Sequence, residues 1–393
     1  MKDFIIKKIP LMSAVVLLVF LVGLSSLNKK EDQRHAKASA AIKTEEVRGV
    51  WVTYMDLDMS GTDRDYNSFK EKFKHIADTA KKDGFNTLIV HTRPFCDAIY
   101  KSKYFPFSHI ISGEQGKDAS YDALKFAVDY THRIGLKIEA WVNPYRVRSD
   151  PSLTLSKNNP YIKDPSLGVK VGKEIILNPA LPKVKELIKN GIRELAENYN
   201  IDGVQFDDYF YPPNVRESFD KEQYSRYRQK AKRPLSLKEW RKANVNTLVA
   251  DCHAILHKNG KTFGISPQGN LDNNEGLYAD VKSWCEYSGY VDYICPQLYF
   301  SLENPALKFG DALKSWLKLS FSKDVTLYVG LSGYKTGTDL DSGTWQSSDS
   351  ILKTELKQLR AHGVRGFMLY SYADLEDKRA AKEVSNLIDG IKG

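Results

Sequence analysis

The sequence has few cysteines, only four in 393 residues, and no two of them form a C-x-x-C pair. This spacing indicates neither a zinc ribbon nor a thioredoxin-like site. Cys285 and Cys295 are candidates for a disulfide in an oxidising compartment. Buried free thiols are the alternative, because cysteine often serves as a small core residue.

Motifs for nucleotide and nucleic-acid binding are missing as well. No Gly-x-Gly-x-x-Gly follows the first predicted strand, so a dinucleotide-binding sheet is not indicated. No recognised nucleic-acid-binding motif is present. His91 is a lone histidine at the end of a predicted strand, which favours a packed core side chain over a metal ligand. We therefore predict no metal, no cofactor and no nucleic-acid partner.

The first 28 residues are typical of an export signal. A basic start that includes Lys2 precedes an apolar run over residues 9–27. Small residues between Ala36 and Ala41 offer cleavage positions, and a retained membrane anchor through residues 9–27 is the alternative. Residues 1–41 are therefore predicted to be a signal peptide or anchor, and the folded domain spans residues 45–391. We expect the protein to be secreted or to act at the cell wall or membrane.

Part of the basic character belongs to this leader. Residues 1–41 contain seven Lys or Arg and three Asp or Glu, so without them the formal net charge falls from +9 to +5. A modest positive excess on an exported protein suits an anionic cell-wall or membrane surface. Residues 211–237 are strongly basic and are predicted either to hold an anionic polymer or to form a solvated insertion.

Short β-rich runs alternate with amphipathic helical runs from Val47 onward, which is the pattern of a parallel sheet built from βα units. Eight such units predict a single closed (β/α)8 TIM barrel. The predicted strands are Arg48–Met55, Thr87–Pro94, Lys137–Tyr145, Asp202–Tyr211, Thr262–Gln268, Val291–Phe300, Val325–Gly333 and Val364–Tyr372. The predicted helices are Phe69–Lys82, Tyr121–Ile134, Pro182–Tyr199, Leu237–Lys258, Ala279–Tyr287, Ala306–Leu319, Ser350–Ala361 and Arg379–Ile391.

Two adjacent carboxylates, Asp207 and Asp208, follow the fourth predicted strand. Neighbouring like charges raise the pKa of one partner, and this gives an acid and a base from the same residue type. Carboxylates that flank a scissile bond are the machinery of glycoside hydrolysis, so we predict that both are catalytic. A helix cap or a metal-binding carboxylate pair is the alternative.

Polar and aromatic residues at the other strand ends predict a cup that binds a hydroxyl-rich ligand, because aromatic faces suit a pyranose ring and planar amides suit its hydroxyls. Arg93 is less specific, since it is equally suited to an ion pair with Asp97 or Asp207. The predicted substrate-binding residues are Arg93, Trp141, Asn143, Tyr145, Tyr209, Gln268, Gln297, Tyr299 and Tyr370.

Six blocks in order resemble the glycosyl-hydrolase-like family 10 proteins over about residues 45–390. The blocks are Arg48–Thr53, Asn86–Arg93, Ala140–Tyr145, Asn178–Pro179, Asp202–Pro212 and Asp292–Tyr299. The resemblance implies a (β/α)8 barrel and glycoside hydrolysis. Bacterial members of that family include envelope proteins that act on peptidoglycan glycan strands, in particular strands stripped of their stem peptides. The resemblance therefore implies a similar substrate for this chain.

The fourth-strand block is also similar to the Asp-Gly-x-Asp-x-Asp-x-Glu signature of family 18 chitinases. Asp202, Gly203 and Asp207 match it, but Gln205 replaces an Asp and Tyr209 stands where the acid Glu would be. The chitinase mechanism therefore cannot be carried over unchanged.

Two arrangements of the carboxylates remain open. In the first, one of Asp207 and Asp208 protonates the leaving oxygen while the other stabilises positive charge or activates water. Because adjacent strand residues point to opposite faces, this arrangement requires the strand to end before them. In the second, Asp207 acts as nucleophile with a carboxylate from another strand end, such as Asp97 or Asp374.

We predict an exported glycoside hydrolase that cleaves cell-wall peptidoglycan strands. A hydrolase of another polysaccharide and a non-catalytic glycan-binding barrel are the alternatives, because a fold does not fix a substrate.

Overall fold

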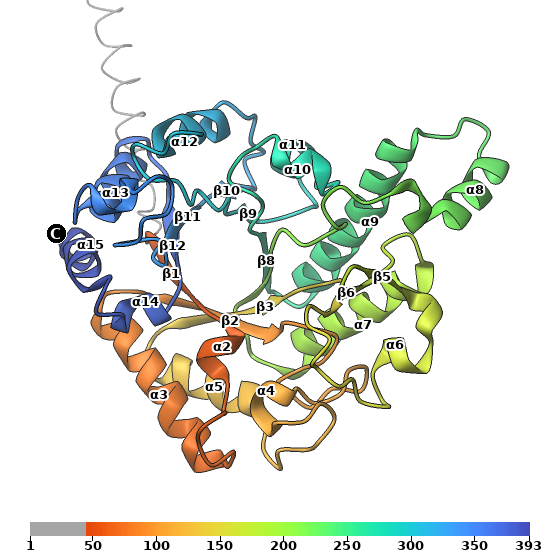
Figure 1. Cartoon of the computed structure of the whole chain (residues 1–393), viewed down its shortest axis with the longest axis horizontal. Coiled ribbons are helices and arrows are strands. Elements are labelled where there is room, and N and C mark those ends of the chain that lie inside the picture. The colour runs from red at the N-terminus through yellow and green to blue at the C-terminus, as the bar shows by residue number, and fades with distance from the viewer. Residues whose placement is uncertain (1–44) are drawn as a thin grey trace, which may run out of the picture. The chain divides into compact units, whose positions relative to one another are not determined.

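The computed structural model describes residues 45–393, which form one compact unit from Glu46 to Gly393 (Figure 1). The predicted signal or anchor in residues 1–41 lies outside the described residues. Within the described part of the chain, no helix has the length and apolarity needed to cross a membrane.

Parallel strands form a barrel at the centre of the molecule, and helices surround it (Figure 1). The order of strands around the sheet is β10-β9-β8-β7-β3-β2-β1-β12-β11. The strands are β1 Val47–Val52, β2 Thr87–Arg93, β3 Lys137–Val142, β7 Gly203–Phe206, β8 Thr262–Ile265, β9 Tyr293–Ile294, β10 Thr326–Leu327, β11 Val329–Ser332 and β12 Gly366–Tyr370.

The barrel closes where the seventh predicted strand divides into β10 and β11. β10 pairs with β9, and β11 pairs with β12, so the two ends of the sheet are consecutive in the chain. Backbone hydrogen bonds cross the join, from Tyr328 N to Ile294 O at 2.9 Å and from Leu298 N to Gly330 O at 3.0 Å. The predicted TIM barrel is confirmed.

The helices that follow the strands place apolar faces against the barrel, as their amphipathic patterns predict. Four of them end at a glycine with a positive φ, at Gly84 (94°), Gly135 (82°), Gly260 (65°) and Gly363 (70°), as expected for C-terminal caps. The surrounding helices are α3 Tyr66–Lys82, α5 Ala123–Arg133, α7 Pro182–Asn198, α9 Leu237–Lys258, α11 Val281–Glu286, α12 Phe309–Leu317, α13 Ile351–Ala361 and α15 Ala381–Lys392.

The connecting loops carry further elements that the periodic pattern did not predict. A three-stranded antiparallel sheet in the order β4-β6-β5 follows β3, and α8 projects from one side of the molecule (Figure 1). The strands of this sheet are β4 Arg146–Arg148, β5 Gly168–Val171 and β6 Glu174–Leu177. The short helices are α2 Tyr54–Leu57, α4 His109–Ser112, α6 Pro160–Lys163, α8 Lys221–Lys230, α10 Asn273–Gly276 and α14 Ala373–Glu376, with 3-10 turns at Pro165–Leu167, Glu217–Phe219 and Thr344–Gln346.

Inside the barrel, a hydrogen-bonded chain of buried side chains fills the space below the strand ends. Trp51 Nε1 donates to Gln205 Oε1 at 2.6 Å, and Gln205 Nε2 donates to the Tyr293 hydroxyl at 3.0 Å. The Tyr293 hydroxyl in turn donates to Glu139. Burial raises the pKa of Glu139 to about 7. The polar side chains inside the barrel are therefore hydrogen-bonded to one another and packed among aromatic rings. This network holds the bottom of the space between the strand ends in place.

The four cysteines are all buried and free. Cys285 and Cys295 therefore do not form a disulfide, and the alternative of buried thiols is confirmed. Burial raises the pKa of the Cys285 thiol to about 12, so it stays protonated and packs as a small apolar residue.

Replacing Gly264 by Ala is expected to destabilise the fold by about 1–3 kcal/mol. A Cβ at this position of β8 would lie 1.9 Å from the Tyr293 ring. That ring cannot move aside easily, because its hydroxyl is held between Glu139 and Gln205. Urea unfolding measures the change in the free energy of unfolding. The control is Gly276→Ala, where a Cβ meets nothing within 4 Å. Equal stability of the two variants would contradict the packing described here.

Candidate active site

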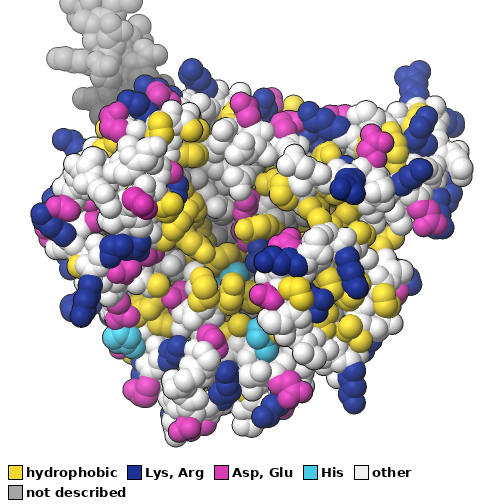
Figure 2. Space-filling model, viewed as in Figure 1, with side chains coloured by type: hydrophobic (Ala, Val, Ile, Leu, Met, Phe, Trp, Pro, Cys, Tyr) yellow, Lys and Arg dark blue, Asp and Glu magenta, His cyan; other side chains and the backbone are white. Residues whose placement is uncertain are grey.

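A cavity of about 750 Å³ opens at the carboxyl ends of the barrel strands. Figure 2 shows this face of the molecule hollowed at its centre, with hydrophobic side chains gathered around the hollow. The carboxylates that line the cavity are Asp207, Asp208 and Asp374. Its aromatic lining consists of Trp51, Trp141, Tyr209, Tyr299, Phe300, Tyr334 and Tyr370. This mixture of stacking faces, amides and acids fits the binding of a sugar.

Asp207 and Asp208 both reach the cavity because β7 ends at Phe206, one residue before them. In a continuing strand their side chains would point to opposite faces. Here the chain turns after Phe206, and the Tyr209 backbone N–H donates to Asp207 Oδ1 at 3.2 Å. The first of the two predicted arrangements of carboxylates is therefore compatible with the geometry.

Each of the two carboxylates is held by its own pair of side-chain donors. Trp141 Nε1 donates to Asp207 Oδ2 at 3.3 Å, and Asn143 donates to the same oxygen. Gln297 Nε2 donates to Asp208 Oδ1 at 3.2 Å, and Gln268 donates to Oδ2. β3 thus positions Asp207, while the segments after β8 and β9 position Asp208, so the two acids are oriented independently.

The surroundings of the two acids separate their protonation. Burial and the neighbouring charge of Asp208 raise the pKa of Asp207 to about 7. Burial raises the pKa of Asp208 as well, but amide hydrogen bonds from Gln268 and Gln297 favour its ionised form. The charge of Asp208 in turn favours the protonated form of Asp207. A protonated carboxyl and an ionised one at adjacent positions can act as a general acid and a general base.

Of the two further carboxylates proposed from the sequence, only Asp374 lies at the cavity. Its Oδ2 accepts the Ser371 N–H at 2.7 Å, and burial raises its pKa to about 6. Asp97 is buried elsewhere, where Ser108 and Gln115 donate to it at 3.1 and 3.0 Å. Asp374 is therefore positioned to act as the alternative partner of Asp207, and Asp97 is not.

Most of the predicted substrate-binding residues line the cavity, namely Trp141, Tyr209, Gln268, Gln297, Tyr299 and Tyr370. Tyr209 is the most open of them, with 52% of its surface exposed. The Arg146 guanidinium lies 4.1 Å from the centre of the Tyr209 ring and donates to Asn143 Oδ1 at 3.1 Å. Arg146 therefore places a cation at the rim, close to the two acids.

The remaining three predicted binding residues do not line the cavity. Arg93 follows a register shift in the pairing of β2 with β3, and its guanidinium lies against Gly191 of α7. There it lies 4.3 Å from the Phe105 ring centre, with no ion pair to Asp97 or Asp207 among the described residues. Asn143 lies behind Asp207 and positions it. Tyr145 is buried in the core.

Several cavity residues were not predicted as binding residues. Met55 and Asn273 lie in α2 and α10, short helices whose positions depend on loop conformation. Lys335 reaches the cavity from the loop after β11 and donates to Tyr299 O at 2.9 Å. Trp51 and Tyr334 also line the cavity, and their position near predicted strand ends was the sequence signal that could have found them.

Comparison with known families matches residues 46–346 to the model of the family described as glycosyl hydrolase-like 10. Glycosyl hydrolase YngK of Bacillus subtilis is 31% identical over 354 residues, covering 84% of this chain and 69% of that protein. Glycosyl hydrolase DigH of Escherichia coli K12 is 30% identical over 339 residues, covering 76% of each.

Solved structures confirm the fold. The glycoside hydrolase domain of PgaB (BpsB) from Bordetella bronchiseptica has a TM-score of 0.57 at 12% identity, covering 86% of this chain and 98% of that one. The catalytic domain of a β-amylase from Paenibacillus polymyxa has a TM-score of 0.57 at 12% identity, covering 89% and 99%. The chain therefore belongs to the glycosyl hydrolase-like 10 family and is a glycoside hydrolase.

Proposed function

We propose that this glycoside hydrolase cleaves the glycan strands of bacterial peptidoglycan, with Asp207 and Asp208 as its catalytic acids. The observation that carries the chemistry is the pair of buried, separately held carboxylates at the floor of an aromatic cavity. Adjacent carboxyls with separated protonation supply both the proton and the negative charge that glycoside cleavage needs.

In this mechanism Asp207 donates its proton to the leaving glycosidic oxygen as the bond from the anomeric carbon breaks. Ionised Asp208 stabilises the positive charge that develops on the sugar or removes a proton from the attacking water. The water hydroxyl completes the new reducing end. The water proton returns to Asp207, directly when Asp208 only stabilises charge, or by transfer from Asp208 when Asp208 has removed it. The aromatic side chains of Trp141, Tyr209 and Tyr299 would stack on the rings and hold the bond over the acids.

Turnover is expected to fall as the pH rises through about 7. The folded-state pKa of Asp207 is raised to about 7, so the acid holds its proton below that pH and loses it above. Loss of a general acid lowers kcat/KM about tenfold per pH unit on the alkaline side. The same shift contributes stability at low pH that is lost as the pH rises toward 7. Kinetics between pH 5 and 9, with circular dichroism to check folding, test this, and a rate that rises through pH 7 would contradict it.

The rim of the cavity supports an anionic sugar as substrate. Arg146 stacks on the exposed Tyr209 ring next to the catalytic acids. Muramic acid units carry a lactyl carboxylate, which is free only where the stem peptide has been removed. A cation at the rim would favour such peptide-free strands over neutral polysaccharides.

The segment of residues 211–237 supports the same class of polymer. Its basic side chains are exposed, and Figure 2 shows Lys and Arg gathered over α8. These residues are Arg216, Lys221, Arg226, Arg228, Lys230, Lys232 and Arg233. A cationic projection on a glycoside hydrolase would raise the local concentration of an anionic wall polymer.

Incubation of the purified protein with three substrates tests the proposed substrate. These are intact peptidoglycan, strands stripped of stem peptides by an amidase, and a neutral N-acetylglucosamine polymer. We expect soluble muro-oligosaccharides from the stripped strands, identified by mass spectrometry, and little from the neutral polymer. Cleavage of the neutral polymer alone would show that the protein hydrolyses glycosidic bonds, but it would contradict peptidoglycan as the substrate.

We propose further that the protein works outside the cytoplasm. The support is the basic start followed by the apolar run of residues 9–27. Expression of the full chain in a bacterium, followed by fractionation and N-terminal sequencing, tests this. We expect the protein in the envelope or the medium, and recovery from the cytoplasm alone would contradict export.

A further inference from the structure

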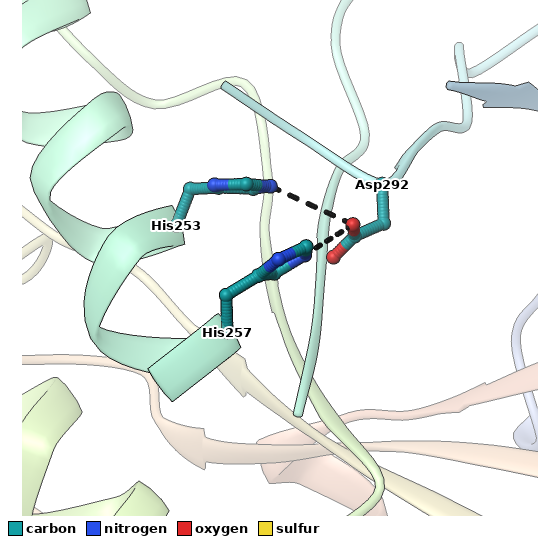
Figure 3. Close-up of side chains that lie close together, drawn as sticks. All are labelled: His253, His257 and Asp292. Carbon is teal, nitrogen blue, oxygen red and sulfur yellow. Dashed lines mark hydrogen bonds and ion pairs between the residues drawn. The ribbon is translucent and has the colours of Figure 1, made fainter. Parts of the chain in front are cut away.

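Two histidines and an aspartate meet at the end of the barrel opposite the cavity. His253 and His257 lie four residues apart in the last turns of α9, and Asp292 immediately precedes β9. Figure 3 shows both imidazoles directed at the Asp292 carboxylate. His257 Nε2 lies 2.6 Å and His253 Nε2 3.5 Å from Asp292 Oδ1. The two rings are 3.9 Å apart at their centres.

The Asp292 carboxylate is fixed by the barrel itself. Its Oδ2 accepts the Phe263 N–H at 2.7 Å, which ties it to the start of β8. Its own backbone N–H donates to Phe263 O at 2.8 Å. The Asp292 oxygen that faces the histidines is therefore held in place whether or not they bind it.

At a second position in the barrel, a helix contacts the aspartate before a strand in the same way, but through only one histidine. Asp202 precedes β7 as Asp292 precedes β9, and its Oδ2 accepts the Ile138 N–H at 2.8 Å. His132, the penultimate residue of α5, contacts Asp202 at 2.9 Å, as His257 in α9 contacts Asp292. Four residues before His132 stands Val128, where α9 has His253. A single histidine is enough to link helix and strand, so the link to the barrel does not account for His253.

We propose that His253, His257 and Asp292 form a binding site for a divalent transition metal ion, with Zn²⁺ as the best-suited ion. Zn²⁺ binds imidazole nitrogen and carboxylate oxygen at about 2.0–2.2 Å, which separates tetrahedral ligand atoms by roughly 3.3 Å. The three ligand atoms here lie within 4.8 Å of one another. Small side-chain rotations therefore bring them to the ligand spacing of zinc.

The burial of the three side chains fits a site that is open on one side. His253 and Asp292 are mostly covered, with 12% and 20% of their side chains exposed, whereas His257 is 51% exposed. A fourth position faces solvent and is free for water, which completes a tetrahedral shell. The bound ion would join the end of α9 to the start of β9, a structural link remote from the catalytic acids.

Thermal unfolding of the full chain, purified without a polyhistidine tag and treated with a chelator, tests the site with added Zn²⁺. We expect Zn²⁺ to raise the unfolding temperature of the wild-type protein, because an ion that binds only the folded state stabilises it. In His257→Ala, where an exposed side chain is removed and folding should persist, the rise should disappear. The apparent Kd for Zn²⁺ should weaken by more than about tenfold, the scale seen when even a supporting group of a metal site is lost.

The matched control is His132→Ala, which removes the histidine that contacts Asp202. This variant should keep the full response to Zn²⁺. An absent response in the wild-type protein would overturn the proposal. So would an equal response in His257→Ala and the wild-type protein, since the ion would then bind elsewhere. Glycan cleavage should not change with Zn²⁺ at the concentrations that stabilise the fold, which separates this test from that of the catalytic site.

Discussion

The Asp207→Asn variant is expected to lose about 10²–10⁴-fold in kcat while it stays folded and still binds glycan. The substitution removes the proton that Asp207 holds up to a pH of about 7. It keeps the size of the side chain, and Trp141 and Asn143 can still donate to its amide oxygen. The loss should therefore appear in kcat, with little change in KM, because the missing interaction acts in the transition state.

The matched control for this variant is Tyr145→Phe. Tyr145 is buried outside the cavity, and its hydroxyl has no hydrogen-bond partner among residues 45–393, so its removal should leave kcat unchanged. Asp208→Asn and Asp374→Asn distinguish the two arrangements of carboxylates. A large loss in Asp208→Asn with a small one in Asp374→Asn supports the adjacent pair. The reverse result would assign the second carboxylate to Asp374, and full activity of Asp207→Asn would contradict both arrangements.

The Arg241→Met variant is expected to lose about 3–5 kcal/mol of stability, the cost of leaving a buried charge without its partner. Arg241 and Asp220 form an ion pair at 2.6 Å with 1% and 0% of their side chains exposed. The guanidinium also donates to Arg216 O at 2.9 Å and to the Tyr278 hydroxyl at 2.8 Å. These bonds tie the basic segment of residues 211–237 to α9, so the loss should also loosen that segment.

Chemical denaturation measures this change, and Lys238→Met is its control. Lys238 lies in the same helix and pairs with Glu275 at 2.6 Å, but both side chains are about half exposed. Exposed ion pairs contribute only about 0–1 kcal/mol. The double variant Arg241→Met with Asp220→Asn should recover part of the loss, because the unpaired charge is gone. A loss in Arg241→Met no larger than that of the control would contradict the structural role of the pair.

Most of the fold could be predicted from the sequence because its βα units are strongly periodic. Buried apolar strands, amphipathic helices and glycine caps such as Gly84 each indicate the same arrangement. The division of the seventh strand could not be predicted. Tyr328 interrupts it because the backbone there must turn from pairing with β9 to pairing with β12, a requirement of barrel closure. The sheet of β4, β5 and β6 was missed because its strands are only three or four residues long.

The cavity residues were predictable because they lie at or just beyond the carboxyl ends of barrel strands, and the failures have local causes. Arg93 follows a register shift that strand periodicity does not reveal. Asn143 was assigned to substrate binding, whereas the structure uses it to hold Asp207. The sequence contains His253 and His257 four residues apart, and the prediction of no metal site overlooked this pair. Its meaning depends on Asp292, which only the folded barrel brings beside it.

The measurement that tests the central claim most directly counts the new reducing ends formed on peptide-free glycan strands. Products of the wild-type protein, Asp207→Asn and Tyr145→Phe are reduced with borohydride and weighed by mass spectrometry. If Asp207 and Asp208 hydrolyse the glycosidic bond, the wild-type protein and Tyr145→Phe yield one reducible end for each bond cut, and Asp207→Asn yields almost none. Equal yields from Asp207→Asn, or product ends that cannot be reduced because no water was added, would contradict hydrolysis by this pair.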